Sequence, residues 1–152
     1  LSDVLNGFEQ AYARIQKMTP PLSSEESFRI TLPEGKMTLI GRIDAVYTDG
    51  DSVEIVDYKT SSSATTPDKA KRSTTSSKQL EMYALAWREK HHQMPNKLSL
   101  DFVVTNQVGS VKKRESTLDN LVDKLNDAAD KIRAMDFQPG YSHDFCRHPE
   151  VK

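Results

Sequence analysis

Hydrophobic residues recur at three- and four-residue intervals in three stretches of the chain, which is the spacing of one face of an α-helix. The stretches are residues 2–17, 78–92 and about 118–135. Their apolar stripes are Val4, Leu5, Phe8, Tyr12 and Ile15; Leu80, Ala84 and Trp87; and Leu121, Leu125, Ala128 and Ile132. Ser116 and Asp119 resemble a capping box at the start of the third stretch. The pattern therefore predicts three amphipathic helices.

Five other stretches have the length and composition of β-strands. Four are rich in β-branched and apolar residues and the fifth is a polar partner of the fourth; they are residues 27–32, 37–47, 52–60, 98–105 and 110–117. The dipeptide Asp49-Gly50 between the second and third strands is a strong hairpin signal. Residues 106–109 predict a turn between the last two strands. The first three strands are therefore expected to form a β-meander.

Residues 60–77 contain almost no apolar side chain, and this composition predicts a flexible loop. The order of elements is then αβββαββα, which predicts an α/β (α+β) domain whose central mixed sheet contains the meander and is flanked by helices. A length of 152 residues suits a single domain over residues 1–152. Because the chain begins with Leu1 and not with Met, we expect this domain to be excised from a longer protein.

Composition and charge argue against a disordered chain, a strongly basic polyanion-binding protein and a membrane-spanning protein. The chain is 36% hydrophobic and 28% charged, as in a globular domain. It carries 21 Lys and Arg against 22 Asp and Glu, so contact with nucleic acid would need a local basic patch. No run approaches the roughly 18 apolar residues of a membrane helix, so we expect no membrane partner and a cytoplasmic location. The single cysteine, Cys146, fits a reducing compartment.

Asp44, Asp57 and Lys59 are charged residues inside otherwise apolar predicted strands, where Asp in particular is disfavoured. Alternation places Asp57 and Lys59 on one face of the third strand, after Val53 and Ile55. Asp44 lies near the start of the hairpin that joins the second strand to the third, so the hairpin can bring it beside Asp57. Each strand then begins apolar and ends charged, which predicts a polar site at the rim of the sheet.

Two neighbouring carboxylates repel one another, and a hard divalent cation removes that repulsion. Mg²⁺ or Mn²⁺ prefers oxygen ligands, lowers the pKa of a bound water and polarises a phosphoryl oxygen. An ammonium such as that of Lys59 can orient the water or stabilise charge on the phosphate. Asp44, Asp57 and Lys59 therefore suit metal-assisted hydrolysis of a phosphodiester. The alternative is structural: a D-x-K pair at a strand end is common, and Asp44 could pair with Arg42 or Lys59.

Three motifs in the chain resemble those of RecB-type nucleases in the PD-(D/E)xK superfamily. These are Gly41-Arg42-Ile43-Asp44, Ile55-Val56-Asp57-Tyr58-Lys59-Thr60 and the helix start from Gln79 to Tyr83. They occur in the family's order and span about residues 26–87. The resemblance implies a restriction-endonuclease-like core and a nuclease that uses one or two Mg²⁺ or Mn²⁺ ions.

The resemblance also implies roles for individual residues. Asp44 and Asp57 would be metal ligands, with the backbone carbonyl of Tyr58 as a third. Lys59 would be the catalytic lysine. Gln79 and Tyr83, one helical turn apart, would orient Lys59 or contact DNA; the alternative is a helix start and a half-buried aromatic.

The family often adds an acidic residue or a histidine from the first helix or strand. Glu26, just before the first predicted strand, corresponds to the position of that acid in many members, and Glu9 in the first helix is a weaker candidate. An exposed glutamate ahead of a strand is the structural alternative for Glu26.

Many RecB-type domains also bind an iron–sulfur cluster through four cysteines, and this chain has one, so no such cluster is expected within it. His143, Cys146 and His148 lie where the family's C-terminal cysteines would fall, and we interpret them as a degenerate remnant or, alternatively, as solvated tail residues or a zinc site of poor spacing.

A local basic patch is predicted beside the site. Lys69, Lys71 and Arg72 belong to the 60–77 loop, and Lys78 follows it. These cations could contact DNA phosphates. The alternative is a mobile, solvated loop, and both hold if the loop becomes ordered on DNA.

These observations predict a metal-dependent DNA nuclease, an exonuclease that acts in recombination or double-strand-break repair as the nuclease module of a helicase–nuclease. Its partners would be DNA and a helicase, the latter in the same chain or in a partner subunit. It would act at the bacterial nucleoid. A stand-alone exonuclease of the kind found in CRISPR adaptation is an alternative within this class. A non-catalytic DNA-binding or scaffold module that keeps the fold is the alternative from another class, and a hydrolase of another phosphodiester is a third.

Overall fold

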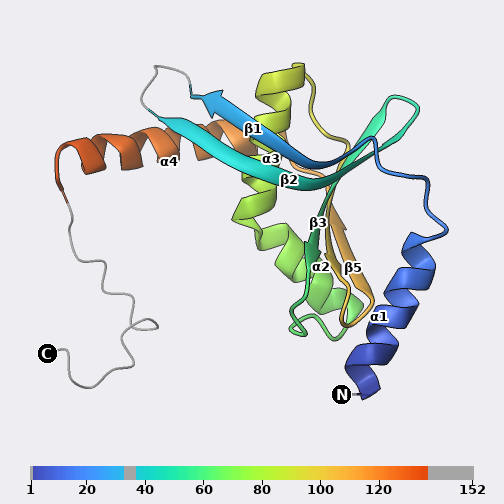
Figure 1. The fold of residues 1–152 in the computed structure, drawn as a ribbon. Helices are drawn as coiled ribbons and strands as arrows, with labels where there is room; N and C mark the ends of the chain where they lie inside the picture. The colour runs from blue at the N-terminus through green and yellow to red at the C-terminus, as the bar shows by residue number, and fades with distance from the viewer. Residues whose placement is uncertain (1, 33–36, 137–152) are drawn as a thin grey trace, which may run out of the picture.

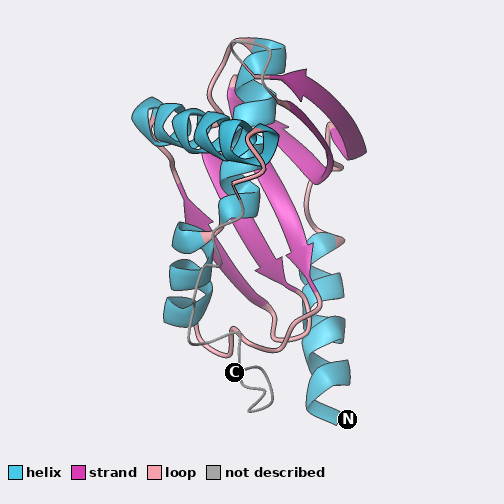
Figure 2. Cartoon of the chain, turned by 90° about the vertical axis from the view of Figure 1, so that its left-hand side faces the viewer, coloured by secondary structure: helices cyan, strands magenta, loops and turns pink. Residues whose placement is uncertain are grey.

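A computed structural model describes residues 2–32 and 37–136 of the chain. Four helices and five strands follow one another in this part. They are α1 (Ser2–Ile15), β1 (Ser23–Thr31), β2 (Thr38–Asp49), β3 (Ser52–Lys59), α2 (Pro67–Ser76), α3 (Lys78–His91), β4 (Lys97–Phe102), β5 (Gln107–Val111) and α4 (Glu115–Arg133). Figure 1 shows their arrangement, and Figure 2 shows the strands between α1 on one side and α2 with α4 on the other.

The five strands form one mixed sheet in the order β1-β2-β3-β4-β5. β1, β2 and β3 are antiparallel neighbours, as the hairpin signal at Asp49-Gly50 predicted, and Gly50 has the left-handed backbone (φ of 57°) that such a turn requires. β3 and β4 run parallel and are joined by the crossover through α2 and α3. β4 and β5 are antiparallel. The predicted α+β fold with a central mixed sheet and a β-meander is confirmed.

The hydrophobic core lies between the sheet and α3. The α3 side chains that the core buries include the predicted stripe of Leu80, Ala84 and Trp87. On the sheet, alternate residues of β4 face this core, namely Leu98, Leu100 and Phe102. The same face of β3 continues to Lys59, which pairs with Phe102 across the β3–β4 ladder. The core thus supports the strand end that carries the charged residues.

The face that α1 buries differs from the predicted one. Its apolar stripe stays largely exposed, with Tyr12 64% and Leu5 57% accessible, whereas Gly7 and Ala11 are buried. Nη2 of Arg14 in α1 donates to both carboxylate oxygens of the buried Asp101 of β4, at 2.8 and 3.0 Å. The helix was therefore predicted correctly, but its buried face was not. The close approach of Gly7 to Val104 and the ion pair of Arg14 orient α1, and the apolar stripe does not.

The prediction of a flexible loop over residues 60–77 was wrong for its second half, which forms α2. Thr66 caps the helix by accepting a hydrogen bond from the amide of Lys69, and Pro67 begins it. The small faces of Ala70 and Thr74 are buried against β5, where a Cβ on Gly109 would lie 2.3 Å from the carbonyl oxygen of Ala70. Tertiary packing on a glycine therefore stabilises a helix that has almost no apolar residues of its own.

Several boundaries also differ from those predicted. β1 begins at Ser23 and not at residue 27, and β4 ends at Phe102 and not at residue 105. β5 begins at Gln107, inside the stretch expected to be a turn, and the turn instead ends at Asn106, which has a left-handed φ of 50°. α4 begins at Glu115 after Arg114, which makes no side-chain cap, so the predicted capping box at Ser116 is wrong. Within residues 2–32 and 37–136, no helix has the length and apolar character needed to cross a membrane.

Candidate active site

Asp44 and Asp57 meet where the β2–β3 ladder ends. The ladder pairs Ala45 with Val56, so the two aspartates are the next residues along each strand. The amide of Tyr58 donates a 2.9 Å hydrogen bond to Oδ2 of Asp44. A side-chain carboxylate of β2 therefore takes a backbone donor of β3, and this bond ties Asp44 to the strand segment that carries Asp57 and Lys59.

Lys59 connects the sheet to the start of α3. Its Nζ lies 2.6 Å from Oδ2 of Asp57 and donates a 2.6 Å hydrogen bond to Oε1 of Gln79. Nε2 of Gln79 in turn donates to the hydroxyl oxygen of Tyr83 at 2.8 Å. Ser77 caps α3 by accepting from the amide of Leu80, which places Gln79 in the first helical turn. One continuous polar chain thus joins Asp57 and Lys59 of β3 to Gln79 and Tyr83 of α3.

Tyr83 is held by an aromatic contact that explains the glycine before Asp44. The rings of Phe28 and Tyr83 pack edge to face with centroids 6.1 Å apart. A Cβ on Gly41 would lie 2.4 Å from the Phe28 ring. Gly41 therefore provides the space for Phe28, and Phe28 supports the tyrosine that ends the polar chain.

Asp57 is the most buried charged group of the site, with 2% of its surface exposed. Burial raises the pKa of Asp57, and the nearby Asp44 carboxylate raises it further; Lys59 opposes both effects without cancelling them. Oδ2 of Asp57 faces Lys59 as an ion pair and has no well-aligned hydrogen bond among the described residues. The protein therefore holds a carboxylate in a place where additional positive charge would be favourable.

The residues present fit a hard divalent cation. Asp44 and Asp57 offer carboxylate oxygens from neighbouring strands, which is the usual protein contribution to a magnesium site. No group of three or more His, Cys, Asp or Glu side chains suited to a metal occurs within residues 2–32 and 37–136. Within the described residues, the two aspartates are therefore only part of a metal-ligand set. Waters commonly occupy the remaining coordination positions of Mg²⁺.

The carboxylate of Glu26 is bonded to residues other than the two aspartates. Its carboxylate accepts 2.5 Å hydrogen bonds from Nζ of Lys90 and Oγ of Ser23. Burial alone would raise the pKa of Glu26, but these bonds and the positive charge of Lys90 outweigh it and lower that pKa. Glu9 is exposed on α1. The predicted role of Glu26 as a ligand therefore has no support from its contacts.

Glu25, which no sequence motif singled out, lies nearer to Asp44 in the strand register than Glu26 does. The β1–β2 register pairs Ser24 with Ala45 and Glu26 with Ile43, which leaves Glu25 opposite Asp44. Its backbone is left-handed (φ of 55°), a conformation that costs free energy in residues other than glycine and is common at functional sites. Two adjacent glutamates offered no way to choose between them; the left-handed backbone is visible in the structure alone.

The carboxylate of Glu25 forms an ion pair with Arg42 at 2.5 Å, and both side chains are more than half exposed. Burial raises the pKa of Tyr83 most, and the hydrogen bond with Gln79 opposes this rise. The negative charges of Asp57, Asp44 and Glu25 raise the pKa further. Glu25 thus acts electrostatically on the same tyrosine as the two aspartates.

The predicted basic patch lies on α2 and at the start of α3. Lys69 donates to Thr65, and Lys78 pairs with Glu81 at 2.8 Å. Lys71 and Arg72 are exposed, and they line a surface depression of about 330 Å³ along α2. The structure therefore leaves two of the four cations available on one helix. His143, Cys146 and His148 lie outside the described residues.

A family model described as the PD-(D/E)XK nuclease superfamily matches residues 2–152. The chain therefore belongs to this superfamily, and its five-stranded mixed sheet flanked by helices is the restriction-endonuclease-like fold. A search of curated proteins found no match. Membership implies a nuclease, and nucleases of this superfamily generally use divalent metals such as Mg²⁺.

Proposed function

We propose that the chain is a RecB-type, Mg²⁺- or Mn²⁺-dependent deoxyribonuclease domain that acts on linear DNA as an exonuclease. The observation that carries the proposal is the polar chain from Asp57 through Lys59 and Gln79 to Tyr83, with Asp44 bonded to the same strand. A structural salt bridge would not require a buried carboxylate whose pKa is raised. This combination of desolvation and a specific charge partner is typical of active sites.

Asp44, Asp57 and the carbonyl oxygen of Tyr58 would hold the cation. Glu25 stands opposite Asp44 and would supply a fourth oxygen from β1 once its carboxylate turns from the exposed Arg42, because within the described residues it forms no preformed metal-binding group with the two aspartates. Such an ion, when bound, activates water and neutralises charge on the scissile phosphate.

Lys59 has the geometry for the protein's own part in the reaction. Asp57 and Gln79 hold its ammonium at 2.6 Å each, so its position is set before substrate arrives. From there it orients the attacking water or stabilises the negative charge that develops on the phosphate. Gln79 and Tyr83 are positioning residues that keep Lys59 in place.

DNA is the substrate that the surface favours. Lys71 and Arg72 lie on α2, which directly precedes the helix of Gln79, and their exposed charges suit phosphates. The biological setting that we propose is recombination or double-strand-break repair in the cytoplasm, with a helicase in the same protein or in a partner subunit. A stand-alone exonuclease would use the same site.

The experiment is Mn²⁺-dependent degradation of linear and circular DNA by the wild type, Asp57→Ala and Lys59→Ala, together with calorimetric titration of Mn²⁺. We expect degradation of linear DNA to fall at least 100-fold in both variants, since each removes a group that acts in the transition state. Lys59→Ala should still bind Mn²⁺, whereas Asp57→Ala should not.

A matched control is Lys97→Ala, which removes a surface lysine paired with Glu54 and should leave activity unchanged. Full activity in Asp57→Ala or Lys59→Ala would overturn the proposed site. A wild type that neither binds Mn²⁺ nor cleaves DNA would instead indicate the non-catalytic DNA-binding module. Cleavage of other phosphodiesters without cleavage of DNA would indicate a different substrate.

A further inference from the structure

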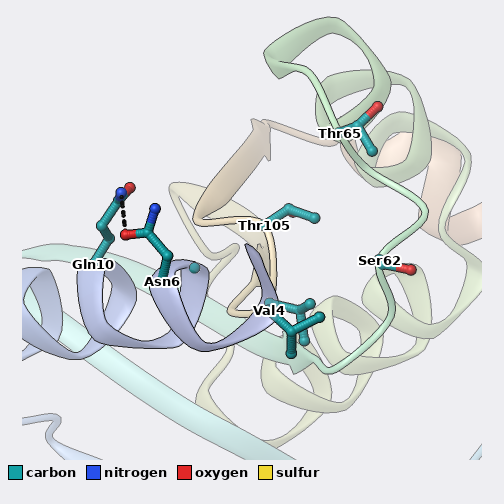
Figure 3. A pocket seen from close by; sticks show the side chains of 8 residues that line it. Val4, Asn6, Gln10, Ser62, Thr65 and Thr105 are labelled. Carbon is teal, nitrogen blue, oxygen red and sulfur yellow. Dashed lines mark hydrogen bonds between the residues drawn. The ribbon is translucent and has the colours of Figure 1, made fainter. Parts of the chain in front are cut away.

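A pocket of about 360 Å³ lies between α1, the segment that follows β3 and the connection from β4 to β5. Figure 3 shows side chains of these three segments around it. The residues that line it are Val4, Asn6, Gly7, Gln10, Ser62, Thr65, Val104 and Thr105. None of them belongs to the polar chain of the active site.

The pocket lies beyond the carboxyl ends of two parallel strands. β3 ends at Lys59, β4 ends at Phe102, and the amide of Val103 donates to the carbonyl oxygen of Lys59 at 3.1 Å. Ligands of open α/β sheets bind in this position. Ser62 follows Lys59 by three residues, so their Cα atoms are at most about 11 Å apart. A DNA strand spans that distance with about three stacked nucleotides.

The lining is polar but carries no charged side chain. It combines the amides of Asn6 and Gln10 with the hydroxyls of Ser62, Thr65 and Thr105, and the methyl groups of two valines complete it. A phosphate would call for lysine or arginine in the lining, whereas Lys69 of α2 reaches it only through a 3.1 Å hydrogen bond to the hydroxyl of Thr65. A nucleobase has apolar faces and a hydrogen-bonding edge, and side-chain amides are the groups that read such edges.

Asn6 presents the open hydrogen-bonding group of the pocket. Its Oδ1 accepts a 3.0 Å hydrogen bond from Nε2 of Gln10, which Figure 3 draws as a dashed line. Oε1 of Gln10 accepts from Asn106 at 3.3 Å, so the orientation of both amides is set. Nδ2 of Asn6 makes no hydrogen bond within the described part of the chain. It is therefore an exposed donor that a ligand acceptor can take in place of water.

The walls of the pocket are fixed before any ligand binds. Gly7 permits α1 to approach the β4–β5 connection, because a Cβ there would lie 1.8 Å from the carbonyl oxygen of Val104. Arg14 anchors the same helix to Asp101. On the opposite wall, Oγ1 of Thr105 donates to the carbonyl oxygen of Ala64 at 2.6 Å. Binding would then cost little reorganisation.

We propose that this pocket receives one unpaired nucleobase of the DNA strand whose backbone lies at Asp57 and Lys59. The inference rests on the proposed nuclease function and adds to it a subsite for one base, which single-stranded DNA or a frayed end can fill. A base in a duplex would first have to leave its stack, which costs a few kcal/mol. The pocket thus selects an unpaired strand near the scissile phosphate.

The test uses the full chain without divalent metal and single-stranded oligonucleotides that carry 2-aminopurine at successive positions. We expect the fluorescence of the base analogue to rise at one position, because the pocket holds that base unstacked. Asn6→Leu should abolish the rise and weaken binding roughly fivefold to tenfold, about 1–1.4 kcal/mol. An abasic nucleotide at that position should weaken binding by the wild type as much as Asn6→Leu does. It should not weaken binding by Asn6→Leu any further.

Lys71→Ala serves as the control, since it should weaken binding at every position and reduce its salt dependence, whereas the effect of Asn6→Leu should persist at high salt. Equal fluorescence at all positions, or unchanged binding by Asn6→Leu, would overturn the pocket. Asn6→Asp, which keeps the shape and loses the donor, should behave like Asn6→Leu; wild-type behaviour of this variant would also count against the pocket.

Titration of Mn²⁺ and hydrolysis of linear DNA by the same proteins separate the two proposals. Wild-type hydrolysis without a position-dependent signal contradicts the pocket and leaves the nuclease assignment intact. A position-dependent signal that Asn6→Leu abolishes, without hydrolysis or Mn²⁺ binding, supports the pocket and contradicts the nuclease assignment.

Discussion

Nζ of Lys59 and Oδ2 of Asp57 lie 2.6 Å apart although their surroundings differ, because 32% of the lysine side chain is exposed and 2% of the aspartate is. The pair therefore spans the boundary between the interior of the sheet and solvent. Burial raises the pKa of Asp57 more than the ammonium lowers it. The Asp57–Lys59 pair accordingly contributes little to folding stability. Its raised carboxylate pKa and its specific charge partner are typical of reactive groups.

Gln79→Leu should lower kcat on linear DNA roughly 10- to 100-fold with little change in KM, because Lys59 loses the acceptor that positions it. Gln79→Glu keeps an oxygen for Lys59 and should retain most of the activity. Tyr83→Phe leaves the bond between Lys59 and Gln79 in place and should have a smaller effect than Gln79→Leu. Steady-state kinetics in Mn²⁺ measure all three.

Gln93→Leu makes the same chemical change at an exposed glutamine that contacts the carbonyl oxygen of Asp51, and it should leave kcat unchanged. Equal kcat values for the wild type and Gln79→Leu would show that Gln79 does not position Lys59.

Asp57→Asn should raise the melting temperature of the metal-free protein at neutral pH by several degrees. The folded-state pKa of Asp57 is raised, so its contribution to stability is present at low pH and is lost as pH rises through that pKa. The gain should therefore shrink as pH falls toward 3.8, the ordinary aspartate value. Thermal unfolding between pH 4 and 8 measures it.

With Mn²⁺ present, the wild type should be more stable than Asp57→Asn. The ion stabilises the wild type by binding its folded state, and Asp57→Asn has lost a ligand. Asp123→Asn, at an exposed position of α4, is the matched control and should change little at any pH. A metal-free Asp57→Asn protein less stable than the wild type at pH 7 would mean that the ion pair with Lys59 outweighs the cost of burying the carboxylate.

Glu25→Gln should weaken Mn²⁺ binding roughly 10-fold, about 1.4 kcal/mol, if this residue supplies an oxygen to the ion beside Asp44. Glu26→Gln should leave the affinity unchanged, because Lys90 and Ser23 occupy its carboxylate. Arg42→Ala should tighten binding slightly, since it removes the ion-pair partner of Glu25. Isothermal titration of the three variants tests this; loss of affinity in Glu26→Gln alone would support Glu26, and not Glu25, as the ligand.

Much of the site could be predicted because its signals are local. The Asp-Gly turn sets the β2–β3 pairing, and the two-residue period then puts Asp57 and Lys59 on one face with Asp44 near them. Gln79 and Tyr83 are one helical turn apart whatever surrounds them. The choice between Glu25 and Glu26 was not local, because it depends on how β1 meets β2 and on a left-handed residue within that pairing.

By itself the sequence determined the mixed sheet, its meander and the polar rim of β3, since hairpin chemistry, strand alternation and helix spacing act between near neighbours in the chain. Tertiary structure alone decided that α2 is helical on Gly109, that α1 packs through Gly7 instead of its apolar stripe, and that a pocket forms beyond Lys59. Each of these depends on close backbone contacts between distant segments, and such contacts leave no periodic pattern in the residues that make them.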